Sequence, residues 1–167
     1  MVQPESVPGP ILAALERREV SYVLIGGLAA VAHGSPIPTN DVDVTPETSH
    51  ENLSRLSNAL RDLDAKVRAE GVDGGLPFSH DADSLAAVGV WNLTTEFGDL
   101  DISFVPTGTR GYPDLVEDAK ATHAYGVTVT IASLADVIRS KQAANRLKDQ
   151  RVLPVLREIL ASRYQGR

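Results

Sequence analysis

The sequence contains no cysteine and is poor in several other features. Without thiols the chain can form neither a disulfide framework nor a thiolate metal site, which fits a reducing cytoplasm. Aromatic residues make up 5% of the chain, so we expect no platform on which nucleic-acid bases could stack. The longest apolar stretch, near residues 23–32, is short and broken by glycine, and the first ten residues do not resemble a signal peptide. These absences predict a cytoplasmic protein without a membrane partner.

Charge is distributed unevenly along the chain. The net charge is −6, which argues against a wholly basic nucleic-acid-binding protein. Residues 139–167, however, contain eight Lys or Arg residues and two acidic ones, a net charge of +6, so the preceding 138 residues carry −12. A basic segment on an acidic body favours binding of triphosphate or RNA phosphates, although a solvated helical face would have the same composition.

One stretch, Tyr22–Val44, combines an apolar strand, a glycine pair and two acids. Gly26 and Gly27 follow four strand-forming residues and precede a run of small residues typical of a helix packed closely on a sheet. Asp41 and Asp43 then alternate with valine, which in a strand places both carboxylates on one face. Adjacent carboxylates suit a cation such as Mg²⁺, and the unpaired amides of a Gly-Gly turn suit a phosphate. This stretch predicts the parts needed for metal-assisted phosphoryl or nucleotidyl transfer.

A second alternating segment lies at residues 99–105, in the returning strand of a hairpin expected over residues 94–104. An acid here could join the first two. Asp101, between two apolar residues, is the better candidate, whereas Asp99 lies nearer the turn and is expected to be exposed. Each motif alone also fits an ordinary turn or a polar strand face.

The remaining pattern predicts a single α/β (α+β) domain, in which 43% hydrophobic residues can form a core. Residues 71–84, rich in glycine and acid, are expected to form a loop in which Asp81 and Asp83 are turn and cap residues. We expect a core over residues 1–132 and a helical segment over 133–167, packed on it. The other expected elements are helices over residues 10–19, 49–64, 84–88, 112–120 and from 134 onward, and strands over residues 66–69, 89–95 and 123–131.

The strand, the glycine pair, the two acids around Val42 and the third acid, in this order, resemble the nucleotidyltransferase superfamily related to DNA polymerase beta. The resemblance implies a minimal mixed β-sheet flanked by helices. It implies that Asp41 and Asp43 hold the metal ions, and that Asp101 shares a metal and helps to deprotonate the attacking hydroxyl. It also implies a nucleoside triphosphate bound at Gly26 and Gly27. The remaining residue expected to bind nucleotide on this side is Thr39.

Residues 133–156 are similar to the closing segment of bacterial AbiEii-type and MenA-like nucleotidyltransferase toxins. Those toxins have a helical lysine followed by an Arg-x-Lys-Asp stretch, and Lys141, Arg146, Lys148 and Asp149 stand at these places. Lys141, with Lys148, would then screen the β and γ phosphates. Gly27 departs from the pattern, because many members have serine there. This branch implies a tRNA 3′ end as acceptor and a cognate antitoxin as protein partner.

The sequence therefore predicts an enzyme that uses Mg²⁺ (or Mn²⁺) to transfer a nucleoside monophosphate from a triphosphate to an acceptor hydroxyl. An acceptor hydroxyl on a protein or on a small molecule such as an aminoglycoside is the enzymatic alternative. A nucleotide-binding or antitoxin-like module with a decayed site is the non-enzymatic one. An RNA acceptor predicts steep salt dependence, which a small-molecule acceptor does not.

Overall fold

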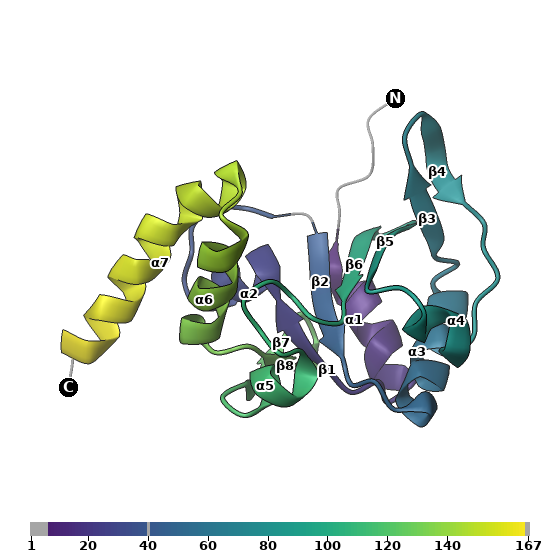
Figure 1. Cartoon of the computed structure of the whole chain (residues 1–167), viewed down its shortest axis with the longest axis horizontal. Helices are drawn as coiled ribbons and strands as arrows, with labels where there is room; N and C mark the ends of the chain where they lie inside the picture. Colours follow the sequence, from purple (N-terminus) through teal and green to yellow (C-terminus); the bar gives the residue numbers. More distant parts are fainter. Residues whose placement is uncertain (1–6, 40, 166–167) are drawn as a thin grey trace.

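A computed structural model describes residues 7–39 and 41–165 of the chain (Figure 1). Within these residues it contains one sheet of eight strands, in the order β4-β3-β5-β6-β2-β1-β8-β7, and seven helices. The strands are β1 (Tyr22–Ile25), β2 (Asp41–Pro46), β3 (Lys66–Ala69), β4 (Val72–Leu76), β5 (Val90–Thr95), β6 (Gly98–Ser103), β7 (Lys120–Ala124) and β8 (Val127–Ile131). The helices are α1 (Pro8–Arg17), α2 (Gly26–Ala32), α3 (His50–Asp62), α4 (Ala82–Ala86), α5 (Tyr112–Val116), α6 (Leu134–Ala144) and α7 (Leu147–Gln165).

The sheet is mixed, and its parallel pairs lie at its centre. β2 runs parallel to β6 and β1 runs parallel to β8, whereas the other neighbouring strands are antiparallel. The α+β fold class predicted from the sequence is thereby confirmed. Because β2 and β6 are parallel and side by side, the two acidic strands present their alternating residues in the same direction.

One face of the central strands is packed and the other carries the acids. Val42 and Val44 of β2 and Leu100 of β6 are at most 1% exposed. They belong to one buried cluster that also contains apolar residues of α1 and α3. Alternation along each strand then directs the aspartates between these residues to the opposite face. The core therefore fixes the direction in which the acids point.

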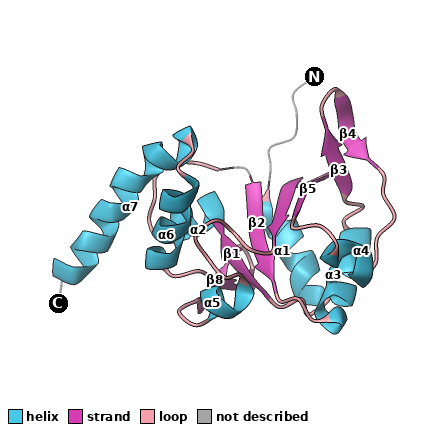
Figure 2. Ribbon diagram, in the orientation of Figure 1, coloured by secondary structure: helices cyan, strands magenta, loops and turns pink. Residues whose placement is uncertain are grey.

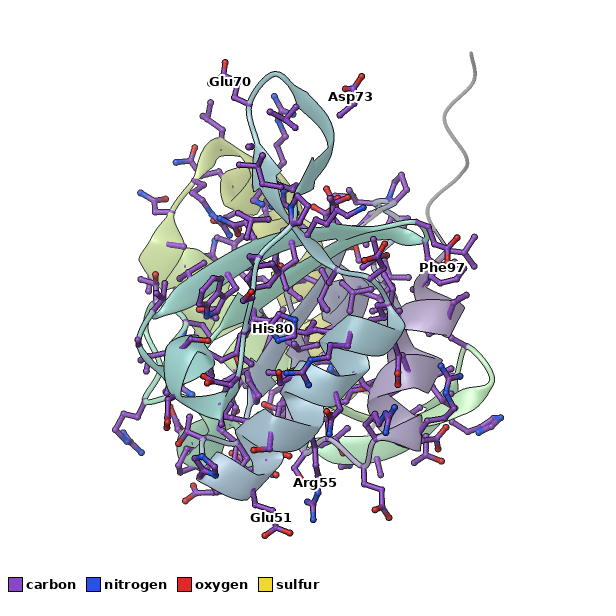
Figure 3. All side chains as sticks on the ribbon, turned by 90° about the vertical axis from the view of Figure 1, so that its right-hand side faces the viewer. Glu51, Arg55, Glu70, Asp73, His80 and Phe97 are labelled. Carbon is purple, nitrogen blue, oxygen red and sulfur yellow. The ribbon has the colours of Figure 1, made fainter. Side chains whose placement is uncertain are left out.

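Two predicted elements were wrong, and both concern hairpins. Residues 72–76, expected in a loop, form β4, which pairs with β3 although Gly74 and Gly75 have positive φ values of 78° and 81°. Figure 3 shows Glu70 and Asp73 pointing away from this hairpin, and β4 is mostly exposed. The glycines in this segment disfavour a strand, but hydrogen bonds to β3 stabilise the extended conformation.

The second correction lies between β7 and β8. The helix expected over residues 112–120 ends at Val116, and Lys120–Ala124 forms β7 instead. β7 pairs with β8 around Tyr125 and Gly126, whose φ values of 56° and 80° suit a tight hairpin turn. The expected single strand over residues 123–131 is therefore a turn and two strands.

The last two helices lie beside the end of the sheet that carries α2 (Figure 2). Ser133 caps α6 by accepting a hydrogen bond from the amide of Asp136, and α6 ends at Asn145, which adopts a left-handed conformation with φ of 52°. Pro154 lies inside α7 without ending it. None of the helices in the described part of the chain is long and apolar enough to span a membrane.

Candidate active site

The turn between β1 and α2 brings the glycine pair against the acids. The helix begins at Gly26, two residues earlier than expected, directly after the extended Ile25. Gly26 has a φ of +71°, and a Cβ atom built on it would lie 2.8 Å from Cγ of Asp43. Only glycine meets both conditions, because other residues disfavour this φ and would collide with the carboxylate.

Four carboxylates lie in two rows across β2 and β6. In the parallel register Asp43 is opposite Asp101, and Asp41 is opposite Asp99. Since residues in register share a sheet face, the acids of the two strands are neighbours rather than separate motifs. The structure thus brings together Asp41, Asp43 and Asp101, the three acids predicted to hold metal.

The electrostatics of this cluster favour a cation. Burial raises the pKa of Asp43 to about 7, with contributions from the charges of Asp101 and Asp41 and partial opposition from two lysines. Burial also raises the pKa of Asp101, although Arg68 opposes the shift. Both shifts have the same physical cause, which is negative charge held close together and away from water.

A buried ion pair lies on the helical side of the acids. Lys141 of α6 is 9% exposed, and its Nζ lies 3.7 Å from Oδ1 of Asp149, which is fully buried. Arg146 donates to the Asp149 carboxylate from its backbone amide and from Nε, at 3.1 and 2.7 Å. Burial lowers the pKa of Lys141, and the charge of Asp149 opposes this. Lys141 is therefore held near the acids by an anion that is not part of the acid cluster.

All residues predicted to form the site line one pocket of about 670 Å³. The pocket extends from the β1–α2 turn across the sheet face and is closed on one side by α6 and the start of α7. The predicted residues in its lining are Gly26, Gly27, Thr39, Asp41, Asp43, Asp101, Lys141 and Lys148. The structure places these residues around one space, and their individual roles remain predictions.

Thr39 takes up the space beside Gly27. A Cβ atom on residue 27 would lie 2.9 Å from Oγ1 and 3.0 Å from Cβ of Thr39, so a serine here would require Thr39 to move. The Thr39 hydroxyl also accepts a hydrogen bond from the amide of Asp41, at 3.4 Å. A hydroxyl is therefore present beside the turn, although Gly27 itself has none.

Arg68 is a residue of this site that the sequence interpretation missed. It lies on β3, lines the pocket, and its Nη2 donates to Oδ1 of Asp101 at 2.7 Å. The only local signal was the alternation of Lys66 and Arg68 in a predicted strand. That alternation places both cations on one face but does not identify their partners.

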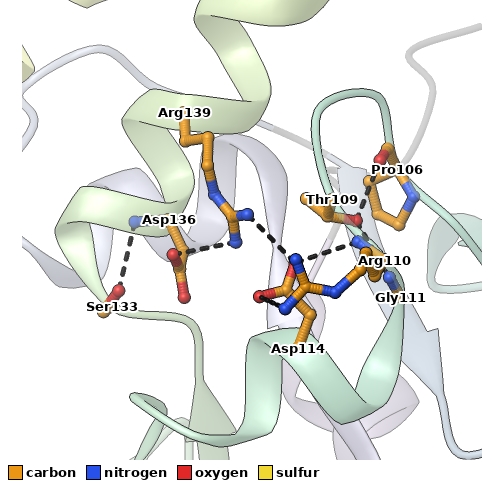
Figure 4. A network of polar contacts seen from close by, with 8 residues as sticks. All are labelled: Pro106, Thr109, Arg110, Gly111, Asp114, Ser133, Asp136 and Arg139. Atoms are coloured by element: carbon orange, nitrogen blue, oxygen red, sulfur yellow. Dashed lines mark hydrogen bonds and ion pairs between the residues drawn. The ribbon is translucent and has the colours of Figure 1, made fainter.

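A network of polar contacts joins α5 and the loop before it to α6, the helix that carries Lys141 (Figure 4). Arg139 of α6 lies 3.0 Å from both Asp114 and Asp136. The hydrogen bond from Arg139 lowers the pKa of Asp114. Gly108 packs against the same helix, because a Cβ atom on it would lie 2.7 Å from Cβ of Ala143. These contacts hold the pocket wall formed by α6 in place.

The chemistry of the donor set fits a divalent cation, although its arrangement is not that of a complete chelate. Among residues 7–39 and 41–165, no three His, Cys, Asp or Glu side chains already form a metal-binding group. Carboxylate oxygens are nevertheless the ligands that Mg²⁺ and Mn²⁺ prefer. Burial, with the charges of Asp101 and Asp41, raises the pKa of Asp43, and a bound cation would oppose this shift. Asp41, Asp43 and Asp101 are the residues in the pocket that could hold such a cation.

Comparison with known proteins finds similarity in structure alone: no protein-family model matches the chain, and no curated protein sequence matches it. The solved structure of the lincosamide antibiotic adenylyltransferase LnuA with lincomycin bound has a TM-score of 0.61 and 16% identity, over 93% of this chain and 99% of that one. ANT(2″)-Ia in complex with adenylyl-2″-tobramycin has a TM-score of 0.52 and 18% identity, over 93% and 95%. A Thermotoga maritima protein described as a nucleotidyltransferase has a TM-score of 0.50 and 20% identity, over 91% and 89%.

At 16–20% identity this likeness shows the fold. The chain has the mixed sheet with flanking helices of nucleotidyltransferases, as the resemblance of its motifs implied. The narrower resemblance to AbiEii-type and MenA-like toxins stays a prediction, as do the tRNA acceptor and the antitoxin partner.

Proposed function

We propose that this protein is a nucleotidyltransferase that transfers a nucleoside monophosphate from a nucleoside triphosphate to an acceptor hydroxyl. The observation that carries the proposal is the register of Asp43 with Asp101 in one pocket with Lys141 and Gly26. Carboxylates suited to a cation and groups suited to phosphate thus surround the same space. The fold shared with adenylyltransferases supports it.

Asp41, Asp43 and Asp101 would hold Mg²⁺ or Mn²⁺. When bound, such an ion activates a hydroxyl nucleophile and neutralises charge that develops on the phosphate oxygens. The chain provides these three ligands on two adjacent parallel strands, so their backbone positions are fixed by the sheet before any ligand binds.

The chain's own groups would orient the triphosphate. Lys141 and Lys148 supply positive charge from the helices, and the Thr39 hydroxyl and the amides of the Gly26–Gly27 turn supply hydrogen-bond donors. In the reaction the acceptor oxygen bonds to the α-phosphorus while the bond to pyrophosphate breaks. The hydroxyl proton passes to Asp101, which faces the pocket beside Asp43.

Two acceptor classes each have an observation in their favour. A small-molecule acceptor is favoured by the fold neighbours, one of which is a lincosamide adenylyltransferase and one of which holds an adenylylated tobramycin. A tRNA 3′ end is favoured by the net charge of +6 over residues 139–167, where Arg151, Arg157 and Arg163 are exposed. A toxin acting on tRNA would also require a cognate antitoxin.

Label transfer tests the proposal and the acceptor class together. The protein is incubated with Mg²⁺ and each α-labelled nucleoside triphosphate in turn, with total tRNA, a soluble protein extract, or a set of aminoglycosides and lincosamides. We expect label on one acceptor class, absent in the double variant Asp41→Asn/Asp43→Asn. Asp81→Asn/Asp83→Asn is the matched control, because it changes another Asp-x-Asp pair, at the N-terminus of α4 and outside the pocket.

The outcomes separate the alternatives. Label on RNA whose yield falls steeply with salt identifies the tRNA branch, and salt-independent label on an antibiotic identifies the small-molecule branch. Label on protein identifies a protein-modifying enzyme. Nucleotide binding without transfer to any acceptor would overturn the proposal in favour of a binding module.

A further inference from the structure

Arg68 connects three strands of the sheet at the edge of the candidate site. Its Nη2 donates to Oδ1 of Asp101 at 2.7 Å, and its Nη1 donates to the carbonyl oxygen of Leu93 at 3.1 Å. Nη1 also lies 3.3 Å from Oδ2 of Asp99. One guanidinium on β3 therefore contacts the backbone of β5 and both acids of β6.

The strand order explains why this side chain reaches the acids. β5 lies between β3 and β6, with Val67 opposite Leu93 and Asn92 opposite Asp101. The long Arg68 side chain crosses β5 to reach β6. In Figure 1, β3 lies on the side of β2 away from α6, so Arg68 and Lys141 approach the acids from different sides.

The contacts of Arg68 hold the Asp101 carboxylate through one of its two oxygens. Oδ1 of Asp101 accepts this hydrogen bond, and within the described residues no hydrogen bond is made to Oδ2. The carbonyl oxygen of Leu93 and the carboxylate of Asp99 hold the guanidinium independently of Asp101. A donor fixed on one carboxylate oxygen orients the other oxygen. Carboxylates that bind metals are commonly oriented by such hydrogen bonds.

We propose that Arg68 is a positioning residue of the metal centre, which holds Asp101 beside Asp43 with one oxygen available to a divalent cation. The inference rests on the proposed function, because it takes Asp101 as a ligand. It adds a residue from the β3–β4 hairpin to a centre otherwise built from β2 and β6. A competing role would be that of a latch, in which Arg68 occupies Asp101 and must leave before a cation binds.

The two roles predict opposite changes in metal affinity. Mn²⁺ binding to the full chain without nucleotide is measured from the free-ion signal in electron paramagnetic resonance. We expect Arg68→Ala to weaken Mn²⁺ binding about tenfold, the lower end of the effect of removing a group that supports a ligand. We expect Arg68→Lys to restore part of the affinity, since one donor remains but the planar fork is lost. Unchanged or tighter binding in Arg68→Ala would overturn the proposal.

Lys66→Ala is the matched control. Lys66 also lies on β3, two residues from Arg68 and therefore on the same face, but it pairs with Asp64 and does not line the pocket. Lys66→Ala removes one positive charge from the same strand, as Arg68→Ala does. A general electrostatic effect would therefore lower the Mn²⁺ affinity of both variants alike. We expect Lys66→Ala to bind Mn²⁺ within twofold of the native protein, and an equal loss in both variants would overturn the positioning role.

A double-variant cycle tests whether Arg68 acts through Asp101. In an Asp101→Asn background, Arg68→Ala should cause no further loss of Mn²⁺ affinity, whereas additive losses would contradict the proposed route. Asp43→Asn separates this inference from the proposed function. If Asp43→Asn abolishes Mn²⁺ binding while Arg68→Ala does not change it, only the inference fails. If native protein binds no Mn²⁺, the metal centre itself fails, and both fall. Circular dichroism and thermal unfolding establish that each variant is folded.

Discussion

Two cations approach the acids of the pocket from different sides, and they differ in the anion that balances them. Lys141 is 9% exposed and lies 3.7 Å from Asp149, a buried carboxylate that Arg146 also binds. Arg68 has a side chain that is 34% exposed, and it lies 2.7 Å from Asp101 in the acid cluster. One cation has a partner outside the cluster, whereas the partner of the other is a candidate metal ligand.

This difference separates two functions that the proposed nucleotidyl-transfer site would need. The position of Lys141 depends on α6 and α7, so its charge can meet a phosphate without any change at the acids. The position of Arg68 is coupled to Asp101, so its effect should be on metal binding. Variants that remove one partner at a time test whether the two cations have separate functions.

The largest expected effect follows from removing the anion of Lys141. Asp149→Ala leaves a buried cation without its partner and removes an acceptor from Arg146, so we expect it to destabilise the fold by about 3 kcal/mol. Chemical denaturation measures this change. Asp62→Ala, which breaks an exposed ion pair with Arg18, is the control and should have a much smaller effect.

The same variant carries a pH signature. Burial alone would raise the pKa of Asp149, but the hydrogen bonds and charge of Arg146, with Lys141, outweigh burial and hold the pKa below its ordinary value of 3.8. An acid with a lowered pKa contributes stability above its unfolded pKa and loses it as pH falls through the folded pKa. The stability gap between native protein and Asp149→Ala should therefore be full at pH 6 and shrink below about pH 4. A gap that is constant with pH would show that packing, not charge, is responsible.

A smaller effect, of opposite sign, is expected at the acids between the two cations. Asp43→Asn removes one negative charge from a partly buried cluster while keeping the side-chain shape. Because burial raises the pKa of Asp43 to about 7, the cost of its charge is full above that pH, and we expect the variant to stabilise the metal-free fold at pH 8 by on the order of 2 kcal/mol, although it abolishes transfer. Unfolding is measured with a chelator present, and Asp73→Asn on the exposed β4 strand is the control. A less stable Asp43→Asn protein would contradict the expected cost of burying the Asp43 charge beside Asp101 and Asp41.

The part of the site formed by β1, β2 and α6 could be predicted from the sequence because its signals are local. Tyr22–Ile25 forms the expected strand, the glycine pair marks the turn, and alternation at Asp41 and Asp43 gives their shared face. Lys141, which the resemblance implied to lie on a helix, is on α6 and is buried with Val137 and Ile138. Each of these inferences needs only the 3.6-residue or two-residue period of one element.

The β3 side could not be predicted because it depends on pairing between distant strands. Arg68 and Asp101 are 33 residues apart in the sequence. They meet because only one strand, β5, lies between β3 and β6 in the sheet. Nothing in residues 66–69 specifies that neighbour, and β4 itself was mistaken for a loop. Strand order is a property of the whole sheet, so a residue that acts across it has no local signature.

A further prediction compares Lys141→Ala with Arg68→Ala in two binding measurements, one for triphosphate and one for Mn²⁺. Lys141→Ala should weaken triphosphate binding about tenfold, measured at an Mn²⁺ concentration that saturates each variant, while Arg68→Ala should change it less than twofold. For Mn²⁺ binding without nucleotide the order should reverse, with only Arg68→Ala showing a loss. If both variants lose affinity in both measurements, the two cations belong to one network and the distinction between them is wrong.

The smallest expected effect concerns the space shared by Gly27 and Thr39 on the nucleotide side. A Cβ atom on residue 27 would lie 2.9 Å from the Thr39 hydroxyl oxygen, so Gly27→Ser should destabilise the fold by about 1 kcal/mol despite the better helix propensity of serine. Thr39→Ala alone should weaken triphosphate binding, because the hydroxyl beside the turn is lost.

In the double variant Gly27→Ser/Thr39→Ala the new hydroxyl occupies the vacated space. It should therefore be more stable than Gly27→Ser and should bind triphosphate more tightly than Thr39→Ala. Additive losses in the double variant would show that the two positions act separately. Recovery in both measurements would show that a hydroxyl is required in this space, from either position in the chain.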